Sequence, residues 1–222
     1  MNFGSVKAIV FDAYGTLFDV HSVIEACHEA FPNKGDKISQ IWRQKQLEYS
    51  FLRSLMGRYR PFVEVTRDAL RFACKELRLT LDSGKEARLM KAYLELKPYD
   101  EVHDVLPQLT GKTLAIFTNG SHNMIDPLIE KYKFTEFLNE VISADHVKQY
   151  KPAPASYTYV LDRIPVKREE VLFLSSNTWD ISGTANFGFH TAWVNRSGGT
   201  MDELGFQPDA VIDDLTELPK LV

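Results

Sequence analysis

Polar side chains end several of the short apolar runs in this 222-residue chain. The run AIVFD ends at Asp12, LAIFTN ends at Thr118 and Asn119, and VLFLSS ends at Ser175 and Ser176. A carboxylate is a weak nucleophile in water, but it becomes effective where water is excluded and N–H groups hold it. Asp12 is therefore a candidate nucleophile, although a short carboxyl side chain here could instead cap the following turn.

The runs that carry these side chains have the apolar, β-branched composition of strands buried on both faces. Six such runs lie at 8–12, 114–119, 140–144, 171–176, 191–195 and 210–214. Segments with helical spacing separate most of them, as in 124–132 and 157–164. This alternation predicts an α/β fold with a doubly wound, Rossmann-like parallel sheet. Ligands of such sheets bind outside the carboxyl ends of the strands, so the polar strand ends should form the site.

The part of the chain from about residue 20 to residue 97 contains no strand candidate. It shows amphipathic helical stretches, and the clearest begins near Asp36, a candidate N-cap, and ends near Gly57. Two further stretches lie at 63–77 and 89–96. An all-helical insert after the first strand predicts a helix-bundle cap. We therefore expect an α/β core domain and a helical cap domain, at 1–18 with 99–222 and at 19–98 respectively.

The composition is that of an ordinary globular protein and disfavours several classes of function. A net charge of −4 gives no basic surface for nucleic acid. No apolar run reaches the roughly 18 residues of a membrane helix, and the N-terminus lacks a signal-peptide pattern. We therefore expect no membrane association and a cytoplasmic location. Cys27 and Cys74 should be buried thiols in helices, and the six histidines show no metal-ligand spacing.

Four short motifs follow one another along the chain: FDAYGT with Asp12, TN at 118–119, QYKP with Lys151 and SSNTWD with Asp180. In this order they resemble the signature of the haloacid dehalogenase superfamily, whose nucleophilic Asp stands in a hydrophobic-D-x-x-G-T pattern. The resemblance spans the whole chain, since the helical insert has the position of the superfamily's cap. It implies the superfamily's α/β core and a nucleophilic role for Asp12.

Position 14 separates two branches of this superfamily. Its phosphatases carry a second Asp two residues after the nucleophile, as general acid, and bind Mg²⁺ with acids of the last motif. Here Tyr14 replaces that acid and Asp180 is the single acid of SSNTWD, so we expect no metal and no other cofactor. The segments DAYGTLFDVHSV, WRQKQLEY, SLMGRYRPF, TNGS, QYKP and SSNTWD closely resemble the L-2-haloacid dehalogenases.

This resemblance implies roles for the residues of a substitution step. Asp12 is the nucleophile, and Lys151 pairs with it. Arg43 and Asn119 receive the departing halide, and Thr118 binds the substrate carboxylate where this branch usually has Ser. A desolvated guanidinium is an apt acceptor for the charge that develops on halide. That argument favours a catalytic role for Arg43 over its alternative as a solvated helix charge.

Further residues are implied to hold the nucleophile, to act on water or to line the pocket. Thr16 and Ser175 hold the carboxylates, while Tyr157, Asn177 and Asp180 order or activate the hydrolytic water. Because Asp180 stands at the start of a predicted helix, a capping role for it stays open. The pocket around the alkyl group is lined by side chains from one helical face and by aromatic residues, namely Gln44, Leu47, Tyr14, Phe62 and Trp179.

These inferences predict hydrolysis of short-chain L-2-haloalkanoates to 2-hydroxyacids with inversion, through an ester on Asp12. The partners would be a small 2-haloacid and the halide product, and the resemblance implies a homodimer. Two other reactions on the same residues stay open: phosphomonoester hydrolysis and the opening of a small strained C–N ring. A non-catalytic scaffold is a further alternative, which the intact Asp12, Lys151 and Asp180 disfavour.

Overall fold

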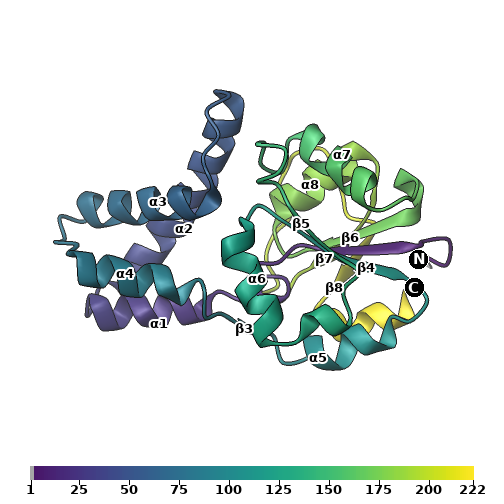
Figure 1. Ribbon diagram of the computed structural model, residues 1–222, viewed down its shortest axis with the longest axis horizontal. Coiled ribbons are helices and arrows are strands. Elements are labelled where there is room, and N and C mark those ends of the chain that lie inside the picture. The colour runs from purple at the N-terminus through teal and green to yellow at the C-terminus, as the bar shows by residue number, and fades with distance from the viewer. Residues whose placement is uncertain (1–2) are drawn as a thin grey trace.

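The computed structural model describes residues 3–222, and its core is a six-stranded sheet (Figure 1). Neighbouring strands all run parallel, in the order β5-β4-β1-β6-β7-β8. The strands are β1 (Ala8–Phe11), β4 (Thr113–Thr118), β5 (Glu140–Ser143), β6 (Val171–Ser175), β7 (His190–Val194) and β8 (Ala210–Ile212). The six predicted strands and the α/β fold class are thereby confirmed.

β1 lies at the centre of the sheet, between β4 and β6. Its residues AIVF are buried on both sides, because helices cover both faces of a doubly wound sheet. Phe11 pairs with Ile116 of β4 and with Leu174 of β6, which sets the register of the three strands. Asp12 therefore leaves the sheet at the same edge as the ends of its two neighbours.

Helices follow the strands and cover the sheet on both faces (Figure 1). α7 (Pro154–Arg163) and α8 (Thr178–Phe187) lie on one face, and α5 (Val102–Val105) and α6 (His122–Lys131) lie on the other. The stretches at 124–132 and 157–164 are helical as predicted, in α6 and α7. Short 3₁₀ helices complete the core at Leu106–Gln108, Phe134–Glu136, Arg168–Glu170 and Leu215–Lys220.

Four helices form a group beside the sheet, at the side toward which β1 runs (Figure 1). They are α1 (His21–Ala30), α2 (Gly35–Leu55), α3 (Phe62–Glu76) and α4 (Ser83–Ala92). The chain passes to and from this group through a two-stranded antiparallel sheet of β2 (Phe18–Asp19) and β3 (Lys97–Pro98). The insert is helical as expected, while the division into core and cap domains at residues 18/19 and 98/99 stays a prediction.

The ends of two helices in this group differ from the prediction. α2 begins at Gly35, so Asp36 lies in its first turn rather than at its N-cap, and its carboxylate contacts the His28 ring at 3.1 Å. The reason is that helical hydrogen bonding begins at Lys34, whose carbonyl accepts from the N–H of Ile38 at 3.0 Å. Gly35 packs closely on α1, because a Cβ there would lie 2.5 Å from Cγ of His28. α4 ends at Ala92, and the chain then turns into β3.

Cys27 of α1 and Cys74 of α3 are buried free thiols, as predicted. Burial raises the pKa of Cys27 to about 12 and that of Cys74 to about 11, so both stay protonated at neutral pH. Among residues 3–222, no helix combines the length and apolar character that crossing a bilayer requires. The cytoplasmic location stays a prediction.

Gly183 of α8 lies against the loop that carries Lys151, and its replacement tests how tightly they fit. An added Cβ would lie 2.4 Å from Cβ of Pro152 and 2.8 Å from the Tyr157 hydroxyl. Because the Pro152 ring cannot swing away, Gly183→Ala should lower the free energy of unfolding by about 1–3 kcal/mol in urea titrations. In the control Gly199→Ala, the new Cβ meets only ordinary contacts at 3.5 and 3.7 Å, so the change should stay within about 0.5 kcal/mol. Equal stabilities of the two variants would contradict the tight fit.

Candidate active site

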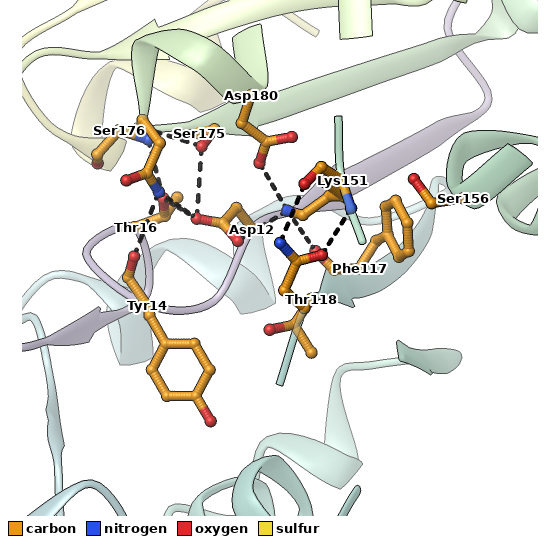
Figure 2. A network of polar contacts seen from close by, with 12 residues as sticks. Asp12, Tyr14, Thr16, Phe117, Thr118, Lys151, Ser156, Ser175, Ser176 and Asp180 are labelled. Carbon is orange, nitrogen blue, oxygen red and sulfur yellow. Dashed lines mark hydrogen bonds and ion pairs between the residues drawn. The ribbon is translucent and has the colours of Figure 1, made fainter. Parts of the chain in front are cut away.

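Lys151 is a buried cation at the carboxyl edge of the sheet (Figure 2). Its ammonium lies 2.9 Å from Oδ1 of Asp12 and 2.6 Å from Oδ2 of Asp180. It also donates to the backbone carbonyl of Phe117 at 3.1 Å. The three donors of the ammonium are thus all used. We call Lys151, Asp12 and Asp180 the buried triad.

Burial and neighbouring charges shift the pKa values of Lys151 and Asp180. Burial alone would lower the pKa of Lys151, but the carboxylates of Asp12 and Asp180 outweigh it and hold this pKa above its usual value. Burial raises the pKa of Asp180 to about 6, although the ammonium of Lys151 opposes the shift. A carboxyl group with such a pKa can accept a proton near neutral pH, as a general base must.

The second oxygen of Asp12, Oδ2, accepts hydrogen bonds from three neutral donors. They are the amide of Asn177 at 2.8 Å, the hydroxyl of Thr16 at 3.2 Å and the hydroxyl of Ser175 at 3.4 Å. These donors come from the turn after β1, the end of β6 and the residue before α8. The contacts expected for Thr16 and Ser175 are therefore present, and together the donors hold the carboxylate in one orientation.

Asn119 holds the backbone of Lys151 in place. Its Oδ1 accepts from the Lys151 N–H at 2.8 Å, and its Nδ2 donates to the Lys151 carbonyl at 3.3 Å. One N–H of the Asn119 amide stays available to a ligand. Thr118, at the end of β4, is buried, and its hydroxyl accepts from the Gly120 N–H at 3.0 Å. Both Thr118 and Asn119 line a small cavity beside Asp12, which we call the central cavity.

Tyr157 and Asp180 contact each other behind Lys151 rather than in the cavity. The Tyr157 hydroxyl donates to Oδ1 of Asp180 at 2.7 Å, and both side chains are buried. Asp180 lies in the first turn of α8, but its carboxylate oxygens bind Lys151 and Tyr157 and make no capping hydrogen bond. The capping alternative for Asp180 is therefore wrong.

The central cavity is small and lies between Asp12 and the helices α2 and α3. Its volume is about 10 Å³, which leaves room for roughly one water molecule. Most of the predicted binding residues meet here. The lining consists of Asp12, Tyr14, Arg43, Leu47, Phe62, Thr118, Asn119, Lys151, Asn177 and Trp179. Gln44 is exposed and lies outside this lining. Among residues 3–222, no group of three or more His, Cys, Asp or Glu is placed to hold a metal ion.

Arg43 brings a cation from α2 to the cavity. Its Nη1 donates to Oε1 of Gln46 at 2.7 Å, and its Nη2 donates to Oδ1 of Asn177 at 3.3 Å. Asn177 thus joins Arg43 to Asp12. Gln46 escaped the sequence reasoning, which selected Gln44 instead, although a residue three positions after Arg43 shares its helical face.

Tyr14, which stands where phosphatases of this superfamily have their second Asp, is buried beside Asp12. Burial raises its pKa, and the nearby Tyr93 and Asp12 add to the shift, so the phenol stays neutral. Its hydroxyl has no hydrogen-bond partner among the described residues. Gly120 makes room for the ring, because a Cβ there would lie 2.7 Å from it.

Comparison with known proteins assigns this chain to a family. A family model described as haloacid dehalogenase-like hydrolase matches residues 6–188. The chain belongs to the haloacid dehalogenase-like hydrolases. The expected resemblance to the L-2-haloacid dehalogenase branch is also confirmed, as the following relatives show.

Two curated relatives align with nearly the whole chain. An (S)-2-haloacid dehalogenase of Pseudomonas putida is 45% identical over 96% of this chain and 95% of its own length. The (S)-2-haloacid dehalogenase 2 of Pseudomonas sp. (strain CBS-3) is 48% identical over 98% of this chain and 96% of its own. The solved L-2-haloacid dehalogenase from Xanthobacter autotrophicus with chloropropionic acid covalently bound is 40% identical, with a TM-score of 0.89 over 97% of this chain and 98% of that chain.

Removal of the Lys151 charge should destabilise this member of the family strongly. In Lys151→Met two buried carboxyl groups lose their cation, so we expect the free energy of unfolding to fall by about 3–5 kcal/mol at pH 7. The loss should be smaller at pH 5, because the Asp180 carboxyl group, whose pKa burial raises to about 6, then binds a proton and loses its buried charge. The exposed pair of Lys91 and Glu95 supplies the control Lys91→Met, which should cost at most about 1 kcal/mol. A loss that does not change between pH 7 and pH 5 would count against buried carboxylates as its cause.

Proposed function

We propose that this protein hydrolyses short-chain L-2-haloalkanoates to 2-hydroxyacids with inversion at C2. The observation that carries the proposal is the environment of Asp12. One of its oxygens accepts from Lys151 and the other from three neutral donors, and its side chain lines the same small cavity as Arg43. A desolvated carboxylate across a cavity from a guanidinium suits substitution at carbon, because one supplies the nucleophile and the other receives the leaving anion.

In the first step a carboxylate oxygen of Asp12 attacks C2 of the substrate from the side opposite the halogen. The new C–O bond forms while the carbon–halogen bond breaks, and the electron pair leaves with the halide. Arg43 and the free N–H of Asn119 receive the halide, and Thr118 binds the substrate carboxylate. Halide needs no proton on departure, so a Tyr at position 14 in place of an acid does not impede this step. Inversion at C2 follows from the backside attack.

In the second step water attacks the carboxyl carbon of the Asp12 ester. Asp180 lies outside the cavity, so it accepts the proton of the water by way of the Lys151 ammonium: Lys151, which lines the cavity, gives a proton to Oδ2 of Asp180 at 2.6 Å and takes one from the water. Tyr157 holds the other oxygen of Asp180. Thr16, Ser175 and Asn177 donate toward Oδ2 of Asp12, where they can stabilise negative charge as the carbonyl is attacked. Collapse then breaks the bond between the carboxyl carbon and the ester oxygen, the 2-hydroxyacid takes up a proton, and Asp12 is restored.

The substrate class rests on the relatives as well as on the site. Two curated relatives that align with nearly the whole chain are named (S)-2-haloacid dehalogenases, and a solved neighbour carries covalently bound chloropropionic acid. A homodimer and a cytoplasmic location belong to the same proposal. The side chains Tyr14, Leu47, Phe62 and Trp179 would surround the alkyl group of the substrate.

Halide release from L- and D-2-chloropropionate, each with and without a chelator, tests this function. We expect chloride from the L-isomer only, at a rate that chelation does not change, and the D-enantiomer of lactate as product. Asp12→Ala should release no chloride. Mg²⁺-stimulated hydrolysis of an aryl phosphate without chloride release from either isomer would contradict the proposal and favour a phosphatase.

The raised pKa of Asp180 predicts the pH dependence of the second step. The ionised form of Asp180 is the base, so lowering the pH through its pKa of about 6 removes it. When ester formed at pH 7 is transferred to lower pH, its hydrolysis should therefore slow by about tenfold per pH unit below 6, whereas an ordinary Asp would retain its charge to about pH 4. Ester on Asp12 is followed by mass spectrometry.

Asp180→Asn should accumulate this ester at every pH, while Asp162→Asn, an exposed change on α7, should behave like the wild type. A rate of ester hydrolysis that stays constant down to pH 4.5 would rule out Asp180 as the base.

A further inference from the structure

Arg43 is held near the cavity by neutral partners. Its guanidinium donates to the amide oxygens of Gln46 and Asn177, and among residues 3–222 it forms no salt bridge. An arginine that contacts only neutral acceptors keeps its full charge for a ligand. This matters under the proposed function, on which the following inference rests, because the departing halide needs an unneutralised cation.

A chain of hydrogen bonds runs from Arg43 through Gln46 into the interior of the helical group. Its Nε2 donates to Oγ1 of Thr66 at 2.8 Å, and the Thr66 hydroxyl donates to the carbonyl of Phe62 at 2.7 Å. Each link therefore has one donor and one acceptor, running from the guanidinium to the first turn of α3. Arginine can only donate, so Gln46 must present its oxygen to Arg43 and its nitrogen to Thr66.

These links are shielded from water and anchored at a second point. Gln46 and Thr66 are both fully buried. The indole N–H of Trp42, next to Arg43 on α2, donates to the backbone carbonyl of Thr66 at 2.7 Å. Loss of a partner inside such a buried network leaves a donor or acceptor unsatisfied, so the side chains have little freedom to take other orientations.

We propose that Gln46 and Thr66 are positioning residues that aim the Arg43 guanidinium at the departing halide and leave its charge unpaired. Neither residue lines the cavity, so both act through Arg43. A glutamate at position 46 would also accept from Arg43, but it would neutralise the charge. The neutral amide supplies the orientation without that loss.

The single-turnover rate of halide release from L-2-chloropropionate and from L-2-bromopropionate tests this proposal. Chloride is the poorer leaving group and depends more on Arg43. Gln46→Leu should therefore slow chloride release by about tenfold or more, against the roughly hundredfold that follows loss of a direct donor, and should slow bromide release less. Gln46→Glu should also slow chloride release. Its carboxylate still accepts the hydrogen bond from Arg43, but its negative charge neutralises the guanidinium.

Two substitutions of Thr66 distinguish a positioning role from a purely structural one. Thr66→Ser keeps the hydroxyl and should retain the wild-type ratio of bromide to chloride rates, while Thr66→Val removes it and should raise that ratio. Gln108→Leu, an exposed change on the core, is the matched control and should leave both rates unchanged.

Two results would overturn the inference while the wild type still releases halide. One is wild-type rates in Gln46→Leu or Gln46→Glu. The other is an equal loss with both halogens that follows the free energy of unfolding, which would indicate a purely structural role. If the wild type releases no halide from either substrate, the proposed function itself fails.

Discussion

A lysine ammonium buried between two carboxyl groups is the interaction on which the rest of this site depends. Removing such ions from water costs several kcal/mol each, so their burial is tolerable only where partners satisfy every donor. Lys151 meets this condition with Asp12, Asp180 and the carbonyl of Phe117. Aromatic rings complete its surroundings, with the ammonium 5.2 Å from the ring centre of Phe117 and 5.1 Å from that of Phe173. The arrangement places two carboxyl groups against one ammonium, beside a cavity with little room for water.

The sheet and the inserted helices supply different residues of the site. The parallel sheet brings Asp12, Thr118 and Ser175 to one edge through its strand register, and the loop before α7 adds Lys151. The helices inserted after β1 supply Arg43 and apolar walls from α2 and α3. A carboxylate alone could attack several kinds of substrate. Under the proposed function, the inserted helices therefore decide which leaving group the site favours, because they supply Arg43.

Much of this could be predicted from the sequence, because the strands are short apolar runs whose polar ends mark the site. The pairing of Lys151 with Asp12 also followed from a motif. Other features depend on tertiary contacts that leave no local pattern. Asp36 is not an N-cap, because the helical hydrogen bonds of α2 begin at the Lys34 carbonyl. Sequence reasoning selected Gln44 and missed Gln46. The i,i+3 spacing places Gln46 beside Arg43, but only the packing of α2 against α3 shows that Gln46 is buried between Arg43 and Thr66.

A single turnover in ¹⁸O-labelled water, with enzyme in excess over L-2-chloropropionate, tests the central claim that Asp12 is the nucleophile. Water that attacks the ester at its carboxyl carbon leaves its oxygen on the enzyme. The account therefore predicts label in the peptide that contains Asp12 and unlabelled lactate from the first turnover, both determined by mass spectrometry. Label in lactate, with none in that peptide, would mean that water attacks C2 directly and would contradict it.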